Sequence, residues 1–85
     1  MITLEQACEN ALSHFKNCWG ETAHIQFIQE TEDIWIITPD SNIDMYGMIP
    51  VSIDKKTGEL KAYPTQRHFD VLEKAPKVKI PSLKN

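Results

Sequence analysis

Residues 49–60 read IPVSIDKKTGEL, and this stretch encodes two β-strands together with the turn that joins them. Val51 and Ile53 alternate with polar residues, which is the two-residue period of a half-buried strand. The Asp54 carboxylate can accept hydrogen bonds from the backbone of a tight turn, and Gly58 can adopt a positive φ where the chain re-enters a strand. The stretch therefore predicts a β-hairpin.

An amphipathic helix is predicted near the N-terminus. Thr3 and Gln6 have the spacing of a capping box, and Ile2 is placed to pack on the first turn. Apolar residues then recur every three or four positions until Gly20, which can end the helix. They are Leu4, Ala7, Cys8, Ala11, Leu12, Phe15 and Cys18 or Trp19.

Two further strands are predicted between this helix and the hairpin. Residues 24–30 begin with an alternating pattern, and residues 33–38 contain a continuous β-branched and aromatic run that suits a central strand. The polar residues 30–33 suit a hairpin connection between them. Pro39 is expected to end the second strand, and a polar loop is expected over residues 40–47.

The remaining strands are expected near residues 48–54 and 59–63, with Pro50 at a ladder position that needs no donor. Thr65 is expected to cap a short helix, which Pro76 ends. The apolar residues of this helix would be Phe69, Leu72 and Val71.

Together these segments predict an α+β fold in which an N-terminal helix packs on a four-stranded antiparallel sheet, with a short C-terminal helix. Residues 1–76 would form a single domain, since a chain of 85 residues supports one compact core. Residues 77–85 form a basic tail that is either extended or an edge strand.

The net charge of −3 conceals a division along the chain. Residues 1–54 carry a net charge of −8, whereas residues 55–85 carry a net charge of +5. An acidic region repels nucleic acid and attracts basic protein surfaces. A protein partner is therefore expected and nucleic acid is not; the alternative is a solvated acidic surface with a basic tail.

The sequence also predicts a cytoplasmic location. No apolar run approaches the roughly 20 residues needed to cross a membrane. The N-terminus lacks the basic and then apolar segments of a secretory signal.

The potentially reactive side chains do not form a catalytic pattern. His14, His24 and His68 share no spacing, and Cys8 lies within the apolar stripe of the first helix. Cys8 and Cys18 are ten residues apart on that helix, about 15 Å along its axis, so they cannot bridge each other. The three glycines serve turns or caps and form no phosphate-binding loop. Neither an enzymatic activity nor a cofactor is therefore expected.

One segment partly matches a calcium-binding loop. Asp40, Asn42 and Asp44 occupy its first three ligand positions. The match stops there, because Met45 stands where the loop needs glycine and Val51 stands where it needs glutamate. Asx hydrogen bonds in a turn explain these residues, and no metal is expected.

The best candidates for a function are two acidic connections, one at each end of the second predicted strand. They could engage a basic partner through charge-assisted hydrogen bonds, with an exposed aromatic residue as an anchor. Trp35 is expected to be buried under the first helix, which leaves a loop tyrosine as the better anchor. The candidate partner-binding residues are Glu30, Glu32, Asp33, Asp40, Asp44 and Tyr46.

Four features can be taken together: the order of elements, Trp35 in the second strand, the spacing from Gly47 to Pro50, and the DKKTGEL turn at 54–60 followed by Thr65. In these features the chain resembles the small YrhB-like immunity proteins of bacterial polymorphic toxin systems. The resemblance covers most of residues 1–75. It implies a cytoplasmic protein that binds a cognate toxin domain and blocks it. The lysine-rich end departs from the acidic and aromatic ending usual in that family.

Two alternatives of other classes remain open at this point. A similar hairpin occurs in peptidase-inhibitory or regulatory modules, in which an exposed strand or hairpin engages an enzyme. A small-ligand binding domain would instead use the concave face of the sheet.

Overall fold

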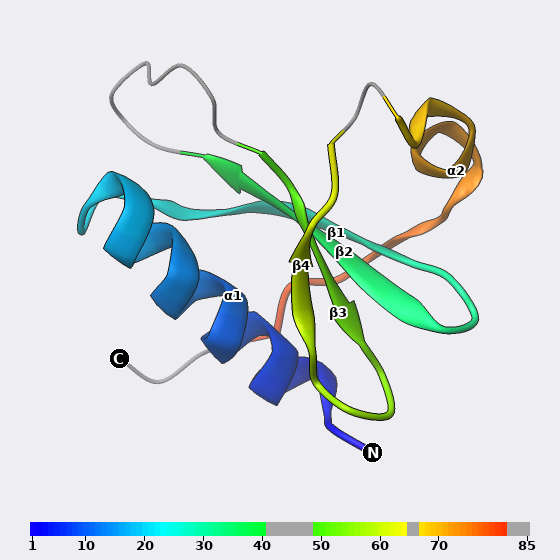
Figure 1. Ribbon diagram of the computed structural model, residues 1–85, viewed down its shortest axis with the longest axis horizontal. Helices are drawn as coiled ribbons and strands as arrows, with labels where there is room; N and C mark the ends of the chain where they lie inside the picture. Colours follow the sequence, from blue (N-terminus) through cyan, green and yellow to red (C-terminus); the bar gives the residue numbers. More distant parts are fainter. Residues whose placement is uncertain (41–48, 65–66, 82–85) are drawn as a thin grey trace.

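The computed structural model describes residues 1–40, 49–64 and 67–81, and it has the α+β architecture expected from the sequence (Figure 1). Within these ranges, five antiparallel strands form one sheet in the order β4-β3-β2-β1-β5. No helix in the described ranges is long and apolar enough to cross a membrane. The elements are α1 (Leu4–Trp19), β1 (His24–Glu30), β2 (Ile34–Asp40), β3 (Val51–Asp54), β4 (Leu60–Ala62), α2 (Phe69–Lys74) and β5 (Lys77–Val78).

The capping box of α1 is confirmed. The backbone N–H of Gln6 donates to Thr3 Oγ1 at 3.1 Å, and Gln6 Oε1 accepts from the Thr3 N–H at 2.9 Å. Gly20 closes the helix with a φ of 93° and donates to the Lys16 carbonyl. These contacts satisfy backbone groups that a helix leaves without internal partners at its ends.

The core lies between α1 and one face of the sheet. Trp35 and Ile37 of β2 belong to the buried cluster beneath the helix, and Trp35 is only 8% exposed, as expected. The other buried members are Ala7, Cys8, Ala11, Phe15, Ala23, Ile28, Val51 and Ile53.

The prediction that Pro39 ends the second strand is wrong, because β2 continues through Pro39 to Asp40. Pro39 faces Ile25 of β1, beside a register shift between Ile25 and Phe27 that gives β1 one extra residue. The pairing of β3 with β2 stops at Ile37, before the proline is reached. A residue without an N–H is tolerated where the ladder is irregular and one side is unpaired.

The turn between β3 and β4 forms as predicted. Asp54 Oδ1 accepts the N–H groups of Lys56 at 2.8 Å and Thr57 at 3.0 Å, and these bonds lower the pKa of the Asp54 carboxyl. Gly58 has a φ of 77°, and a Cβ at this position would lie 3.3 Å from Ile2 Cγ2. The positive φ favours glycine at this position, and a Cβ would in addition require the Ile2 side chain to shift by a few tenths of an ångström.

The capping prediction for α2 is wrong. His68 occupies the N-cap position and makes no side-chain capping hydrogen bond, while Thr65 lies outside the described residues. None of the α2 residues is buried, and Phe69 is 66% exposed. The helix therefore rests on the protein without inserting an apolar face into the core.

A fifth strand extends the expected four-stranded sheet. Lys77 pairs with Gln29 and Val78 pairs with Ile28, so these tail residues take the edge-strand alternative. Val78 packs against the core, whereas the Lys77 ammonium lies 4.5 Å from the centre of the Phe27 ring on the other face. The alternation of apolar and charged residues fits a strand with one face toward the core.

Candidate partner-binding surface

The structure gathers three of the six predicted partner-binding residues at one place. Glu30, Glu32 and Asp33 lie at the connection between β1 and β2, whereas Asp40 ends β2 seven residues later. A strand of this length separates the two acidic connections by about 20 Å. The other two predicted residues, Asp44 and Tyr46, lie outside the described residues.

Backbone hydrogen bonds fix the β1–β2 turn. The Thr31 N–H donates to the Ile34 carbonyl at 3.0 Å, and the Ile34 N–H donates to Thr31 Oγ1 at 3.1 Å. The Asp33 carbonyl accepts from the Lys55 N–H at 3.0 Å, which ties this turn to the β3–β4 turn. The exposed side chains of Glu32 and Asp33 are therefore presented from a well-anchored backbone.

Glu30 differs from its two neighbours because its carboxylate is engaged within the protein. Glu30 Oε2 accepts from Lys55 Nζ at 2.9 Å and from Trp35 Nε1 at 3.0 Å. The hydrogen bond from Lys55, followed by that from Trp35, lowers the pKa of Glu30. The Lys55 ammonium also lies 5.3 Å from the Trp35 ring centroid. Glu30 thus positions the turn, and Glu32 and Asp33 are the better contact groups.

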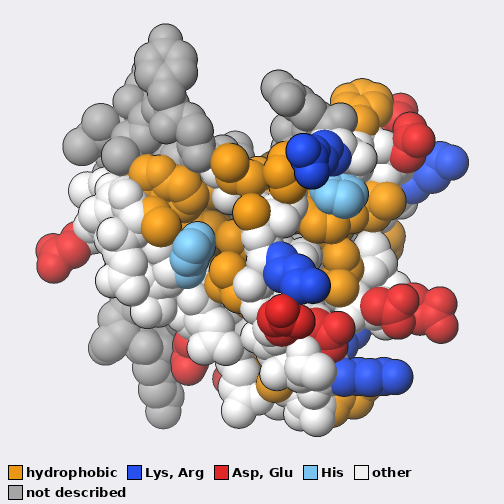
Figure 2. All heavy atoms as spheres, viewed as in Figure 1, with side chains coloured by type: hydrophobic (Ala, Val, Ile, Leu, Met, Phe, Trp, Pro, Cys, Tyr) orange, Lys and Arg blue, Asp and Glu red, His pale blue; other side chains and the backbone are white. Residues whose placement is uncertain are grey.

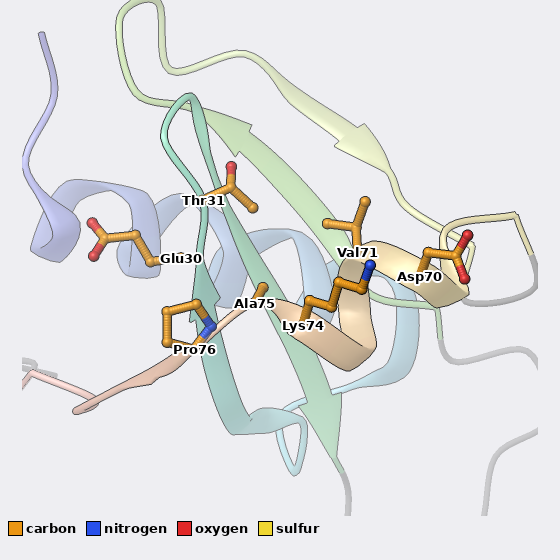
Figure 3. Close-up of a pocket in the computed structure, with 7 residues that line it drawn as sticks. All are labelled: Glu30, Thr31, Asp70, Val71, Lys74, Ala75 and Pro76. Atoms are coloured by element: carbon orange, nitrogen blue, oxygen red, sulfur yellow. The ribbon is translucent and has the colours of Figure 1, made fainter.

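A groove of about 400 Å³ runs between this turn and α2. Figure 3 shows Thr31 on the turn side of the groove and Val71, Lys74 and Asp70 on the α2 side. The Glu30 carboxylate points away from α2 in the same view. The complete lining is Glu30, Thr31, Asp70, Val71, Lys74, Ala75 and Pro76.

A buried glutamine connects β1 to the α2 side of the groove. Gln29 is 4% exposed, and its Nε2 donates to the Leu72 carbonyl and, at 3.0 Å, to the Ala75 carbonyl. The Glu30 N–H also donates to the Pro76 carbonyl at 2.9 Å. Sequence reasoning missed Gln29, because a polar residue in an alternating strand reads as solvent-facing until the helix that covers it is known.

A second hollow, of about 320 Å³, lies on the other side of the acidic turn. Five of its six lining residues are charged, and they include the exposed turn residues Glu32 and Asp33. The residues are Met1, Glu32, Asp33, Asp54, Lys55 and Lys56. The acidic turn therefore stands between a charged hollow and a mainly apolar groove, an arrangement suited to another protein surface.

Asp40 has a different environment. Its carboxylate lies 3.5 Å from His24 Nε2, across the far end of the β1–β2 pair, and both side chains are about half exposed. Asp40 is not part of the surface around the β1–β2 turn.

Within the described segments, no group of three or more histidine, cysteine, aspartate and glutamate side chains is placed to hold a metal ion. Cys8 is buried, and desolvation, with smaller contributions from Glu5 and Glu9, raises its pKa to about 11. Cys18 is exposed, with its Sγ 3.8 Å from His14 Nε2. Both thiols are free, as the helical spacing predicted.

Comparisons with family models, curated proteins and solved structures found no match to this chain.

Proposed function

We propose that this chain is a small cytoplasmic binding protein, without catalytic activity, that neutralises a cognate toxin domain by direct contact. The observation that carries the proposal is the pair of exposed carboxylates, Glu32 and Asp33, on an anchored turn beside an apolar groove. The resemblance of the turn and element order to YrhB-like immunity proteins supports the choice of a toxin as the partner.

The physical properties of this surface favour recognition of a basic protein. Acidic side chains accelerate encounter with a basic surface and form charge-assisted hydrogen bonds with lysine or arginine. The turn is held by its own hydrogen bonds, so little conformational entropy is lost when it binds. The groove next to it can receive one apolar side chain of the partner, which supplies affinity that surface charges alone do not.

Affinity capture from the source cell followed by co-expression tests this function. The captured protein is expected to arrest growth when expressed alone and to be harmless when this chain is expressed with it at equal or greater level. Purified chain should inhibit that protein in a one-to-one complex.

Two other outcomes would contradict the proposal and point to the alternatives. Capture of a peptidase that the chain inhibits would indicate an inhibitory module, and recovery of a metabolite without a protein would indicate a small-ligand domain.

A further inference from the structure

In the part of the chain that the structure describes, strand β4 forms one edge of the sheet and pairs with β3 alone. Lys61 and Ala62 are exposed and Leu60 is partly exposed. In the view shared by Figures 1 and 2, β4 lies in front of the other strands, and hydrophobic side chains are exposed across the upper middle of the same face. An edge with unpaired backbone groups in such a setting is a template for another strand.

The register with β3 shows which β4 backbone groups point outward. The Asp54 N–H donates to the Glu59 carbonyl and the Tyr63 N–H donates to the Pro50 carbonyl, with Lys61 opposite Ser52 between them. In an antiparallel ladder, alternate residues direct both backbone groups to the neighbouring strand, and the residues between them direct both groups away. The N–H and C=O groups of Leu60 and Ala62 therefore face outward.

The side chains along this edge carry opposite charges on one face. Glu59 and Lys61 are two residues apart, and their Oε1 and Nζ atoms lie 3.8 Å from each other with both side chains more than 60% exposed. Leu60, between them, packs against the core on the face that α1 covers. Such an acid-apolar-base sequence is complementary to a second copy of itself in antiparallel orientation.

We propose that two copies of this chain pair through β4 in antiparallel orientation, with Leu60 opposite Leu60 at the two-fold axis. The two leucines then exchange both backbone hydrogen bonds, because their N–H and C=O groups point outward. Glu59 of each copy lies opposite Lys61 of the other, where directly opposed side chains are about 5 Å apart at Cβ. Gly58 lies opposite Ala62 and has no side chain that would obstruct the approach.

Charge selects this register over the nearest alternative. Centring the pair on Lys61 would use the outward groups of Leu60 and Ala62 in both copies, but it would place the two Lys61 ammonium groups directly opposite each other. A lysine on an edge strand normally discourages pairing for this reason. With Leu60 at the centre, the same lysine faces a carboxylate and promotes pairing.

A three-residue edge buries less surface than the roughly 1,600 Å² of a standard interface, so the dimer is expected to be weak. Sedimentation equilibrium of the full chain, from about 10 µM to 1 mM at low salt, should show an average mass that rises from 9.8 kDa toward twice this value. A mass of 9.8 kDa throughout this concentration range would overturn the proposal.

Exchanging the charges at positions 59 and 61 tests whether the two β4 strands pair with Leu60 at the centre. The single variants E59K and K61E should each weaken self-association at least about tenfold, because they place like charges opposite each other. The double variant E59K/K61E should return to within about threefold of the unchanged chain, and an equimolar mixture of the two single variants should form a mixed dimer. The control E9K changes charge at an exposed residue of α1 and should have little effect.

Failure of the double variant to recover dimerisation would overturn this pairing. Amide hydrogen exchange of the unchanged chain supplies a second readout that does not depend on a charge variant. Exchange at the Leu60 N–H should slow as the protein concentration rises, whereas exchange at the Lys61 N–H, already bonded to β3, should not change. A Leu60 amide that is insensitive to concentration would also contradict the proposal.

Discussion

At the scale of single residues, Glu30 links the acidic turn to the rest of the molecule. Its Oε2 atom receives hydrogen bonds from both Lys55 and Trp35, so one carboxylate joins the β1–β2 turn, the β3–β4 turn and the core. The Lys55 side chain is only 15% exposed, and burial of its charge is offset by this ion pair and by the Trp35 ring.

The substitution Glu30→Gln should lower the free energy of unfolding by about 1 kcal/mol at pH 7, a value reduced because the carboxylate is 40% exposed. The pKa of Glu30 is lower in the folded protein than in the unfolded chain, so its stabilising effect is present above the unfolded pKa of about 4.3 and is lost as the pH falls through the folded value. Urea denaturation of both proteins at pH 7 and near pH 2.5 measures this. If the unfolding free energies of the variant and the unchanged protein differ by the same amount at both pH values, the ionised Glu30 carboxylate does not stabilise the fold.

The two cysteines should differ sharply in reactivity. Cys18 is exposed, whereas Cys8 is buried and has its pKa raised to about 11, so little of the reactive thiolate is available at neutral pH. A thiol reagent such as DTNB should titrate one cysteine in the folded protein and two in denaturant. The Cys18→Ser variant should lose the fast reaction, and rapid labelling of that variant in the folded state would show that Cys8 is accessible.

At the scale of elements, α2 is the least securely packed part of the described fold. It has six residues, none of them buried, and the Gln29 side chain donates hydrogen bonds to the carbonyls of Leu72 in the helix and of its C-cap residue Ala75. A helix of this length has little intrinsic stability, so its position depends on these tertiary contacts. The same contacts define one wall of the groove.

The substitution Gln29→Met keeps most of the side-chain volume and removes both donors. We expect the free energy of unfolding to fall by about 1–3 kcal/mol. Amide exchange at Leu72 and Ala75, whose N–H groups are bonded within α2, should accelerate while exchange in β2 stays slow. Unchanged protection of α2 would show that Gln29 does not hold the helix in place.

The groove can be tested with two variants of the same helix. Val71 lines the groove and is 38% exposed, whereas Phe69 is 66% exposed and does not line it. Val71→Lys should weaken binding of the captured partner by at least about tenfold, because it places a charge where an apolar side chain is received. Phe69→Lys is the matched control, and equal losses from both variants would exclude the groove as the specific contact.

Local sequence patterns predicted the helices, strands and turns well, but they predicted the contacts between distant segments less well. Thr3, Gln6, Asp54 and Gly58 act through neighbours in sequence, so α1 and the β3–β4 turn could be predicted from the residues alone. The sequence wrongly predicts that Pro39 ends β2, because the sheet can accept a proline there only next to the bulge in β1. The clustering of Glu30, Glu32 and Asp33 follows from their position in one connection, but the groove beside them depends on Gln29 meeting a helix more than 40 residues away.

At the scale of the whole molecule, the two proposed binding sites lie away from the face of the sheet that packs against α1. One face is filled by α1 and the core, while the β1–β2 turn with α2 and the β4 edge lie at different positions around the sheet (Figure 1). The proposed partner binding at the turn and the proposed self-association at β4 involve different residues, so a variant that removes one property should leave the other unchanged.

We propose that Glu32 and Asp33 guide a basic partner to the β1–β2 turn. The most direct measurement is the association rate with the captured partner in stopped-flow experiments at ionic strengths from about 20 to 500 mM. We expect Glu32→Lys/Asp33→Lys to slow association at least about tenfold at low salt and to flatten its dependence on salt. The control Glu9→Lys/Glu21→Lys, which reverses two exposed charges in other parts of the chain, should behave much like the unchanged protein. Equal association rates and equal salt dependence for the turn variant and the unchanged protein would show that Glu32 and Asp33 do not guide the partner.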